Sequence, residues 1–527
     1  MRAVRVKNLV PFLCALMSVA TAILAGRAQE PGSAFHPMVP RTWDDVAMAT
    51  LEVPLADPVG SPKYVSDDYY YRIPVRPIYK RYPVYAPGHE PPGYLEGLKS
   101  QEPVIVWDDN GHRPVLNTEA DWIEAGEIVF DAPIQYAIVR ARDVQSPVWW
   151  TKVGAQAGKD GTLPGYGYVI SKKGEIEVGN LSCASCHSRL MPDGTVLKGA
   201  QGNFPFDHTT AFQFRSLAAQ PPPGFTPAQF TLMLHLAEYC LYAAPWLKPD
   251  PQAQLQQISI AELASIHEAI PPGVVARHRS SPFYPVQVPD LIGVKDRHYL
   301  DRTGLQQHRG IVDLMRYAAL NQGGDDLASY DGFIPSAFPD FKTLPDPAHA
   351  GFVAQGRYSD EQLYALALYV YSLQPPPNPN KLDAVAAHGQ KVFDREGCAM
   401  CHTPPLYTNN KLTLAEGFTP PAGAVKKYDI LPISVGTDPN LALKTRRGTG
   451  YYKVPSLKGV WYRSMFGHSG WCATLEDWFD PRRTHEDYVP TGFKPYGAKT
   501  YAVKGHPFGL NLSAEDKKAL IAFLKTL

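Results

Sequence analysis

Two short runs of cysteine and histidine carry the clearest chemical signal in this chain. The first is Cys183-Ala184-Ser185-Cys186-His187, and the second is Cys398-Ala399-Met400-Cys401-His402. Two thiols about one helical turn apart can each add to a haem vinyl group, and the histidine that follows can bind the iron. The sequence therefore predicts two covalently attached haem c groups, with His187 and His402 as their proximal iron ligands.

Other uses of paired cysteines explain these runs less well. A zinc site would need both Cys pairs to meet, and it leaves the two histidines without a role. A redox-active disulfide does not require a histidine either. Two further cysteines, Cys240 and Cys472, either pair with each other in an oxidising compartment or are separate buried thiols.

The N-terminus has the pattern of a secretory signal peptide. Arg2, Arg5 and Lys7 precede an apolar run over residues 9–26, which contains Cys14, and small residues near Ala28 offer a cleavage site. The alternative is an uncleaved anchor, which would be the only contact with a membrane, because no later segment is apolar enough to cross one. We expect a signal peptide at residues 1–28 and a periplasmic or otherwise exported protein.

The bulk composition limits the fold and the partners. A chain of 527 residues predicts two or three domains. Its 51 basic and 51 acidic residues balance, so the chain has no excess of positive charge that would favour binding to nucleic acid. The 51 prolines favour long irregular connections. The expected fold class is mainly α with extensive coil.

An internal repeat divides the chain. Residues 126–131 (GEIVFD) recur as residues 389–394 (GQKVFD), and the capping sequences at Ser359 and Ser513 each open a closing helix, to Leu373 and Leu527. The Pro-rich residues 374–385 read as a stiff linker. We therefore predict cytochrome c-like haem domains over residues 116–373, with large insertions, and 386–527. A Pro- and Tyr-rich irregular arm is expected over residues 29–115.

The sixth iron position decides what each haem can do, because two strong protein ligands favour electron transfer and an open position allows peroxide or dioxygen to bind. Met465 and His468 are candidates for the second haem. Met191, His208 and His298 are candidates for the first, and each is as readily explained as an ordinary packing or hydrogen-bonding residue.

The two-module layout resembles the bacterial dihaem cytochrome c peroxidase superfamily, which includes the dihaem rubber oxygenases. The resemblance covers residues 118–527 and is carried by Val454-Pro455-Ser456-Leu457, His468-Ser469-Gly470 and residues 473–476 (ATLE), with a looser counterpart at Val288-Pro289-Asp290-Leu291. It implies that the first haem performs oxidative chemistry and that the second stores or relays electrons. Aligned in this way, His468 is the favoured sixth ligand of the second haem, and Met465 is its rival.

Three features of the resemblance are missing or unplaced. Leu300, beside Tyr299, occupies the position of an inter-haem tryptophan found in peroxidase members. No residue can be assigned as the distal acid, and Asp301 and Asp313 read better as exposed or structural carboxylates. The inter-domain calcium that the resemblance implies has no evident ligand cluster.

The sequence thus predicts an exported dihaem oxidoreductase in which the first haem reacts with peroxide or dioxygen and the second relays electrons. The expected partner is a small redox protein or an organic electron donor or acceptor. Two alternatives stay open. One is an oxygenase that cleaves an apolar organic substrate, and the other is a non-catalytic electron carrier, against which the length of the chain argues.

Overall fold

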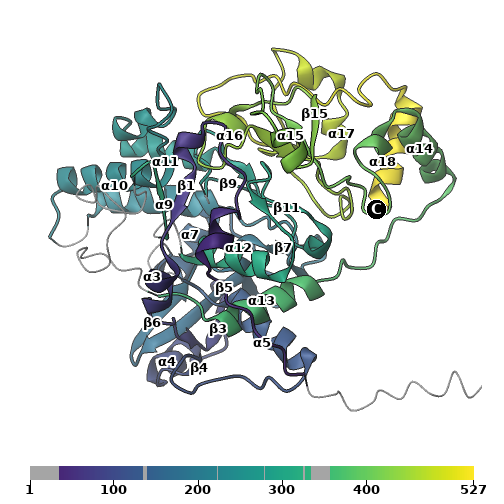
Figure 1. The fold of residues 1–527 in the computed structure, drawn as a ribbon. Coiled ribbons are helices and arrows are strands. Elements are labelled where there is room, and N and C mark those ends of the chain that lie inside the picture. The colour runs from purple at the N-terminus through teal and green to yellow at the C-terminus, as the bar shows by residue number, and fades with distance from the viewer. Residues whose placement is uncertain (1–34, 135–138, 222–223, 278, 324–326, 334–355) are drawn as a thin grey trace, which may run out of the picture.

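The structure is a computed structural model that describes residues 35–134, 139–221, 224–277, 279–323, 327–333 and 356–527. The predicted signal peptide, with Cys14, lies outside these residues. The chain folds into helices, several small sheets and extensive coil (Figure 1). No helix in the described residues is long and apolar enough to span a membrane.

The first elements belong to the region predicted as an irregular arm. They are α2 (Asp45–Ala49), η1 (Pro58–Gly60), β1 (Pro62–Tyr64), α3 (Asp67–Arg72), β2 (Ile78–Tyr79), β3 (Arg81–Tyr85), α4 (Tyr94–Ser100) and β4 (Ile105–Trp107), where η marks a 3₁₀ helix. β2 pairs with β4, but β1 pairs with β13 and β3 with β5, both strands of the next region. The arm therefore contains regular elements and completes sheets of the region that follows it.

The region around the first Cys-x-x-Cys-His run holds most of the remaining elements. They are α5 (Glu119–Asp131), α6 (Ala141–Val144), α7 (Pro147–Val153), β5 (Thr162–Lys172), β6 (Glu175–Gly179), α8 (Cys183–Cys186), β7 (Ser188–Leu190), β8 (Val196–Lys198), α9 (Phe206–Ala219), α10 (Pro227–Tyr242), η2 (Ala253–Gln256), α11 (Ile260–Glu268), β9 (Val274–Val275), β10 (Val286–Gln287), η3 (Val294–Asp296), β11 (Tyr299–Leu300), β12 (Gln306–Gln307), α12 (Ile311–Gly323), β13 (Ala328–Tyr330) and α13 (Asp360–Ser372).

The region around the second run is shorter. Its elements are α14 (Ala384–Arg395), η5 (Cys398–Met400), β14 (Leu412–Leu414), α15 (Ala424–Lys427), β15 (Ile430–Ser434), α16 (Asn440–Leu443), β16 (Tyr451–Lys453), α17 (Leu475–Trp478), η6 (Pro481–Thr484) and α18 (Ala514–Lys525). β14 lies between β15 and β16 in a three-stranded sheet. Figure 1 shows the linker crossing from α13 to α14.

The repeated sequence forms the same helix crossing twice. α5 packs across α13, and α14 packs across α18. At each crossing the glycine that opens the repeat touches the partner backbone: a Cβ on Gly126 would lie 2.0 Å from the Ala365 carbonyl oxygen, and one on Gly389 would lie 1.9 Å from that of Ala519. Only glycine permits so close an approach. The predicted capping box at Ser359 is present, because its hydroxyl and Gln362 exchange hydrogen bonds of 3.1 and 2.8 Å with each other's backbone.

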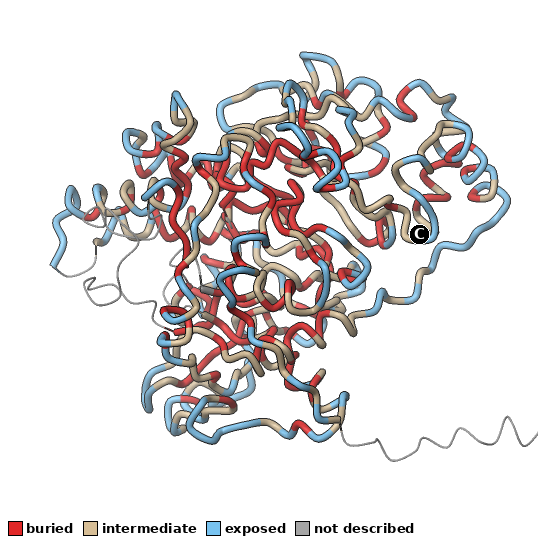
Figure 2. The backbone as a smooth tube through the Cα atoms, in the orientation of Figure 1, coloured by how far each residue is buried: buried red, intermediate tan, exposed pale blue. Residues whose placement is uncertain are grey.

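The arm also reaches the second region. Val53 packs in one buried cluster with Tyr299 and with Tyr428, Ile430 and Tyr451 of the second region. The N–H of Ala56 donates to the Gly448 carbonyl at 2.7 Å. Buried residues, red in Figure 2, are densest through the centre of the view. The first and second regions are therefore packed against each other and against the arm.

A buried charged group ties α9, α10 and α11 together. The two ring nitrogens of His267 lie 2.8 Å from Asp207 and 3.2 Å from Glu238, and all three side chains are buried. Burial alone would lower the pKa of His267, but its hydrogen bonds to the two carboxylates outweigh burial and raise the pKa to about 9. His267 is therefore protonated at neutral pH and neutralises one of two buried carboxylates.

Gly389→Ala should destabilise the second region, because the added methyl group collides with a backbone carbonyl that cannot rotate away. We expect a loss of about 3 kcal/mol or more in unfolding free energy, measured by denaturant titration. Gly97→Ala is the matched control: Gly97 is a helical glycine of α4 with open space around it, and alanine there should be neutral or stabilising by up to about 1 kcal/mol. Equal effects of the two changes would contradict the close helix crossing.

His267→Gln should destabilise the fold in a pH-dependent way. The folded-state pKa of His267 lies above its ordinary value of 6.5, so its charge stabilises the fold fully below pH 6.5 and less as pH rises through 9. At pH 6 we expect a loss of about 3 kcal/mol. Melting temperatures of both proteins from pH 6 to 10 should converge, and a constant difference would show that His267 is uncharged in the fold.

Candidate functional site

Both Cys-x-x-Cys-His runs fold into a single turn, and in the second run the two thiols and the imidazole line one cavity. In α8 the N–H of His187 donates to the Cys183 carbonyl at 2.8 Å, and in η5 the N–H of His402 donates to the Cys398 carbonyl at 2.8 Å. The Ser182 hydroxyl caps α8 by accepting from the Ser185 N–H. A closed turn of this kind is compatible with thioether attachment to a haem, which stays a prediction.

The imidazole of His402 is held in one orientation by backbone carbonyls. Its Nδ1 lies 3.1 Å from the Pro455 oxygen and 3.2 Å from the Tyr407 oxygen, so Nδ1 carries the proton. Burial lowers the pKa of His402 to about 4. The ring is therefore neutral at pH 7 with an Nε2 lone pair available, which is the form that binds a metal.

His187 has an equivalent environment. Burial lowers its pKa to about 4, and the Pro289 carbonyl opposes that shift. Its Nδ1 is buried, but no described residue meets hydrogen-bond geometry with it. Pro289 and Pro455 occupy the same place in the Val-Pro-x-Leu segments that repeat in the sequence. The repeat thus supplies a proline carbonyl beside each proximal histidine.

The second run opens into an apolar cavity of about 250 Å³. Its wall includes both thiols and His402, together with large apolar side chains: Phe393, Val454, Leu457, Val460, Phe466, Leu475, Trp478, Phe479, Leu520 and Leu524. One edge reaches the surface at Met400, which is 74% exposed, and at Phe508. Two thiols, a neutral imidazole and a dry apolar wall suit a covalently bound haem with one edge near solvent.

The predicted sixth ligand, His468, lies in the wall of this cavity. Its ring stacks on Tyr452 at 4.0 Å between centroids and meets Trp471 edge-on at 4.4 Å. Burial, then the charge of Arg302, lowers its pKa to about 3, and its buried Nε2 has no hydrogen-bond partner among the described residues. His468 is therefore neutral and available, and its role as a ligand stays a prediction.

A second histidine, His506, faces His402 across the same cavity. The two ring centroids lie 6.4 Å apart. An iron bound by both rings would separate their centroids by about 6 Å, given metal–nitrogen bonds of about 2 Å. Burial, then the His402 ring and Arg483, lower the pKa of His506 to about 3. His506 is therefore a second candidate for the sixth position beside His468, and the sequence analysis missed it.

The backbone around His506 is held under strain. His506 has φ of +45°, which a non-glycine residue adopts only when its surroundings enforce it. The buried Arg483 guanidinium donates to the carbonyl oxygens of Gly505 at 3.0 Å and His506 at 2.9 Å. No sequence signal marks His506 except its residue type, because it lies far along the chain from the motif and outside any repeated pattern.

Met465, the rival to His468, packs elsewhere. Its side chain lies against Gly273 and Gly470 and joins the buried cluster around Val274 and Trp471. Its neighbours Phe466, Gly467 and His468 line the cavity, but Met465 is not among the described residues that do so.

The three candidates for the first haem have ordinary roles in the fold. His208 Nδ1 contacts the Val153 carbonyl at 2.9 Å. His298 is exposed, and its backbone pairs with His308. Met191 forms a tight turn with Thr195 and packs beside Tyr462. The sixth ligand of the first haem stays unassigned.

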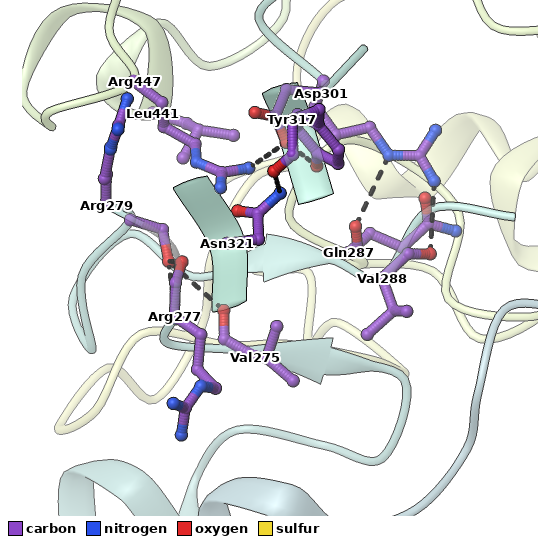
Figure 3. Close-up of polar contacts among 12 residues, drawn as sticks. Val275, Arg277, Arg279, Gln287, Val288, Asp301, Tyr317, Asn321, Leu441 and Arg447 are labelled. Carbon is purple, nitrogen blue, oxygen red and sulfur yellow. Dashed lines mark hydrogen bonds and ion pairs between the residues drawn. The ribbon is translucent and has the colours of Figure 1, made fainter. Parts of the chain in front are cut away.

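The two nearby carboxylates are buried and paired rather than exposed. Asp301 Oδ1 accepts from Arg447 at 2.6 Å and from the Tyr317 hydroxyl at 3.2 Å (Figure 3). Asp313 accepts from Arg309 at 2.7 Å and Arg316 at 3.0 Å. Both therefore have the structural role that the sequence analysis favoured, and the catalytic acid or base stays unknown.

Tyr299 and Leu300, at the position of the absent tryptophan, point into different cores. Leu300 packs in the cluster of α5, α12 and α13, whereas Tyr299 packs with the second region and donates its hydroxyl to the Tyr428 carbonyl at 2.5 Å. In the described residues no group of three or more His, Cys, Asp or Glu side chains is placed to hold a metal ion, which includes calcium. Cys472 is a buried free thiol.

Comparison with family models and with curated protein sequences gives no match. Among solved structures, hydrazine synthase from Kuenenia stuttgartiensis aligns over 60% of this chain and 92% of its own, with 16% identity and a TM-score of 0.28. A MauG-like protein associated with microbial copper homeostasis aligns over 58% and 90%, with 17% identity and a TM-score of 0.27. These TM-scores are too low to carry an argument, so the proposal below rests on the site itself.

Replacement of His506 and replacement of His468 should change the visible spectrum differently. We expect His506→Ala to convert the second haem from low-spin to high-spin in the oxidised protein, because it removes the ring that faces His402. His468→Ala should leave the low-spin signal in place. Loss of the low-spin signal in the His468 variant, with His506→Ala unchanged, would assign the sixth ligand to His468 instead.

Proposed function

We propose that this protein is an exported oxidoreductase that carries two haem c groups, held by Cys183, Cys186 and His187 and by Cys398, Cys401 and His402. The observation that carries the proposal is the duplicated arrangement of a Cys-x-x-Cys-His turn, a neutral buried histidine and a facing proline carbonyl. A redox disulfide would not require the histidines to be held in this way. A zinc site would need a third or fourth ligand near each run, and the described residues contain no group of three or more His, Cys, Asp or Glu side chains placed to hold a metal ion.

The second site is suited to electron relay. When bound, the haems supply one-electron redox chemistry and, at an open position, a site for peroxide or dioxygen. His402, His506 and His468 all line the second cavity, so a haem bound there could be held by two histidines, which would favour electron transfer over substrate binding. The exposed rim at Met400 and Phe508 offers a contact for a small redox protein or an organic electron donor or acceptor.

The first site is where we place the oxidative reaction. Met191, His208 and His298, the three candidates for its sixth position, each have another role in the fold, so we take the first site as the candidate for an open position. Its surroundings also hold the large insertions of the chain, which an electron carrier does not need. The preferred reaction is the reduction of peroxide. The second candidate is an oxygenase that acts on an apolar substrate, and it is favoured because the buried Leu300 stands where peroxidase members have an inter-haem tryptophan.

Spectra and turnover of the purified holoprotein separate these functions. A high-spin haem that binds cyanide or carbon monoxide would support an enzyme, and two low-spin haems without ligand binding would show an electron carrier. Peroxide-dependent oxidation of a reduced cytochrome would then identify a peroxidase. Dioxygen uptake only in the presence of an organic substrate would identify an oxygenase.

The covalent haem count tests the cofactor assignment directly. The wild-type protein should contain two haem c groups per chain by the pyridine haemochrome method. Each double variant, Cys183→Ser/Cys186→Ser and Cys398→Ser/Cys401→Ser, should retain one, because each run attaches its own haem. Cys472→Ser is the control and should retain two. A wild-type protein without covalent haem would refute the proposed cofactors.

A further inference from the structure

Four half-buried cationic side chains lie between the two Cys-x-x-Cys-His runs. They are Arg297, Arg302, Lys453 and Arg463, and they line a small cavity that is bounded by Pro289 and Pro455. Those prolines are the residues whose carbonyls lie beside His187 and His402. Three of the four, Arg302, Lys453 and Arg463, also line the apolar cavity of the second run. The cations therefore border the second haem site on the side that faces the first.

These side chains have only neutral hydrogen-bond partners. Arg302 donates to the Gln287 and Val288 carbonyls over long distances of 3.5 and 3.4 Å (Figure 3). Lys453 donates to the Tyr299 carbonyl at 3.3 Å.

The two remaining arginines follow the same pattern. Arg297 donates to the backbone carbonyls of Asp290 and Ile292. Arg463 donates to the Ser456 carbonyl at 2.9 Å, and its buried Nε has no partner in the described residues. A buried N–H group that has no acceptor, or only a distant one, lowers the stability of the fold because it has lost its hydrogen bonds to water.

The carboxylates nearby do not balance this charge. Asp290 Oδ2 accepts from the Tyr462 hydroxyl at 2.7 Å, and its Oδ1 accepts from the Ile292 N–H at 3.0 Å. Asp301 is paired with Arg447. Within the described residues, none of the four cations has a carboxylate oxygen within salt-bridge distance. The cavity is thus left with a surplus of buried positive charge.

This excess of positive charge, together with burial, lowers the pKa values of two of the cations. Burial, then the charges of Arg463 and Arg297, lowers the pKa of Arg302 to about 9. Burial, then Arg297 and Arg302, lowers the pKa of Lys453 well below its ordinary value. Buried charges of one sign are tolerated only where an anion compensates them. The folded chain therefore has a site prepared for an anion that it does not itself provide.

We propose that Arg297, Arg302, Lys453 and Arg463 form a carboxylate-binding site that holds the propionate groups of the second haem and borders those of the first. The inference rests on the proposed cofactors. Each haem carries two propionates on the edge opposite its vinyl groups, and guanidinium groups bind carboxylates through paired, charge-assisted hydrogen bonds. The same positive charge disfavours a calcium ion in this cavity.

The site has a consequence for electron transfer. Reduction lowers the charge of the iron by one, so buried cations nearby stabilise the reduced haem relative to the oxidised haem. Since three of the cations line the second cavity, their effect falls mainly on the second haem. The cluster therefore raises the reduction potential of the haem that we assign to electron relay.

The test uses the holoprotein with single substitutions. Arg302→Gln and Arg463→Gln should each lower the midpoint potential of the second haem in a spectroelectrochemical titration, and should shift that of the first haem less. Arg463→Lys keeps the charge and should cause a smaller shift. Arg482→Gln is the matched control, because Arg482 is an exposed arginine of the same region, and it should cause none.

A measurement on the wild-type protein covers the case in which a variant fails to fold. Resonance Raman bands of the propionates should shift in D₂O, because the donors that bind them carry exchangeable protons. Unshifted bands, or unchanged potentials in both glutamine variants with two haems present, would overturn the carboxylate site and leave the proposed function intact. Absence of haem at Cys398 and Cys401 would instead remove the proposed function and this inference together.

Discussion

One backbone hydrogen bond, from the histidine N–H of each Cys-x-x-Cys-His run to the carbonyl of its first cysteine, is the contact on which both candidate sites depend. It closes a single turn, and closure of that turn places two thiols and one imidazole on the same side. A thiol cannot reach a vinyl group while the imidazole reaches the iron unless the turn is formed. The Val-Pro-x-Leu segments then place a proline carbonyl beside each ring, and at His402 this carbonyl accepts from Nδ1 and orients the ring.

Burial has opposite consequences for the two kinds of charge around these turns. It keeps His187 and His402 neutral, which suits them to bind iron. The same burial penalises Arg302 and Lys453, which lie in the space between the turns. A histidine responds by losing its proton, but an arginine responds only weakly, so its charge must be met by an anion. Buried arginines without a carboxylate are therefore the more informative observation about what the site binds.

The sequence predicted the features that are local or repeated. The capping box at Ser359 follows from a short pattern that is read directly, and the glycine that opens each repeat proved to be the contact point of a helix crossing. Haem attachment at the two Cys-x-x-Cys-His runs stays a prediction. The strands of the arm could not be predicted, because short strands such as β1 and β3 form only by pairing with strands far along the chain. His506 and the buried cations were missed for the same reason. Their significance lies in which distant residues they face, and no spacing in the sequence records that.

The relative placement of the two sites is set by packing and not by the linker. Residues 374–385 are exposed or half-buried for their whole length, so they limit the separation of the two regions without fixing their orientation. Orientation comes from contacts that cross between the regions. Tyr299 is buried among residues of the second region, the Gln287 N–H donates to the His468 carbonyl at 2.9 Å, and Arg446 caps the end of α10 through three backbone carbonyls. The carbonyls of Tyr299 and Gln287 also accept from Lys453 and Arg302, so the interface between the two regions includes the proposed propionate site.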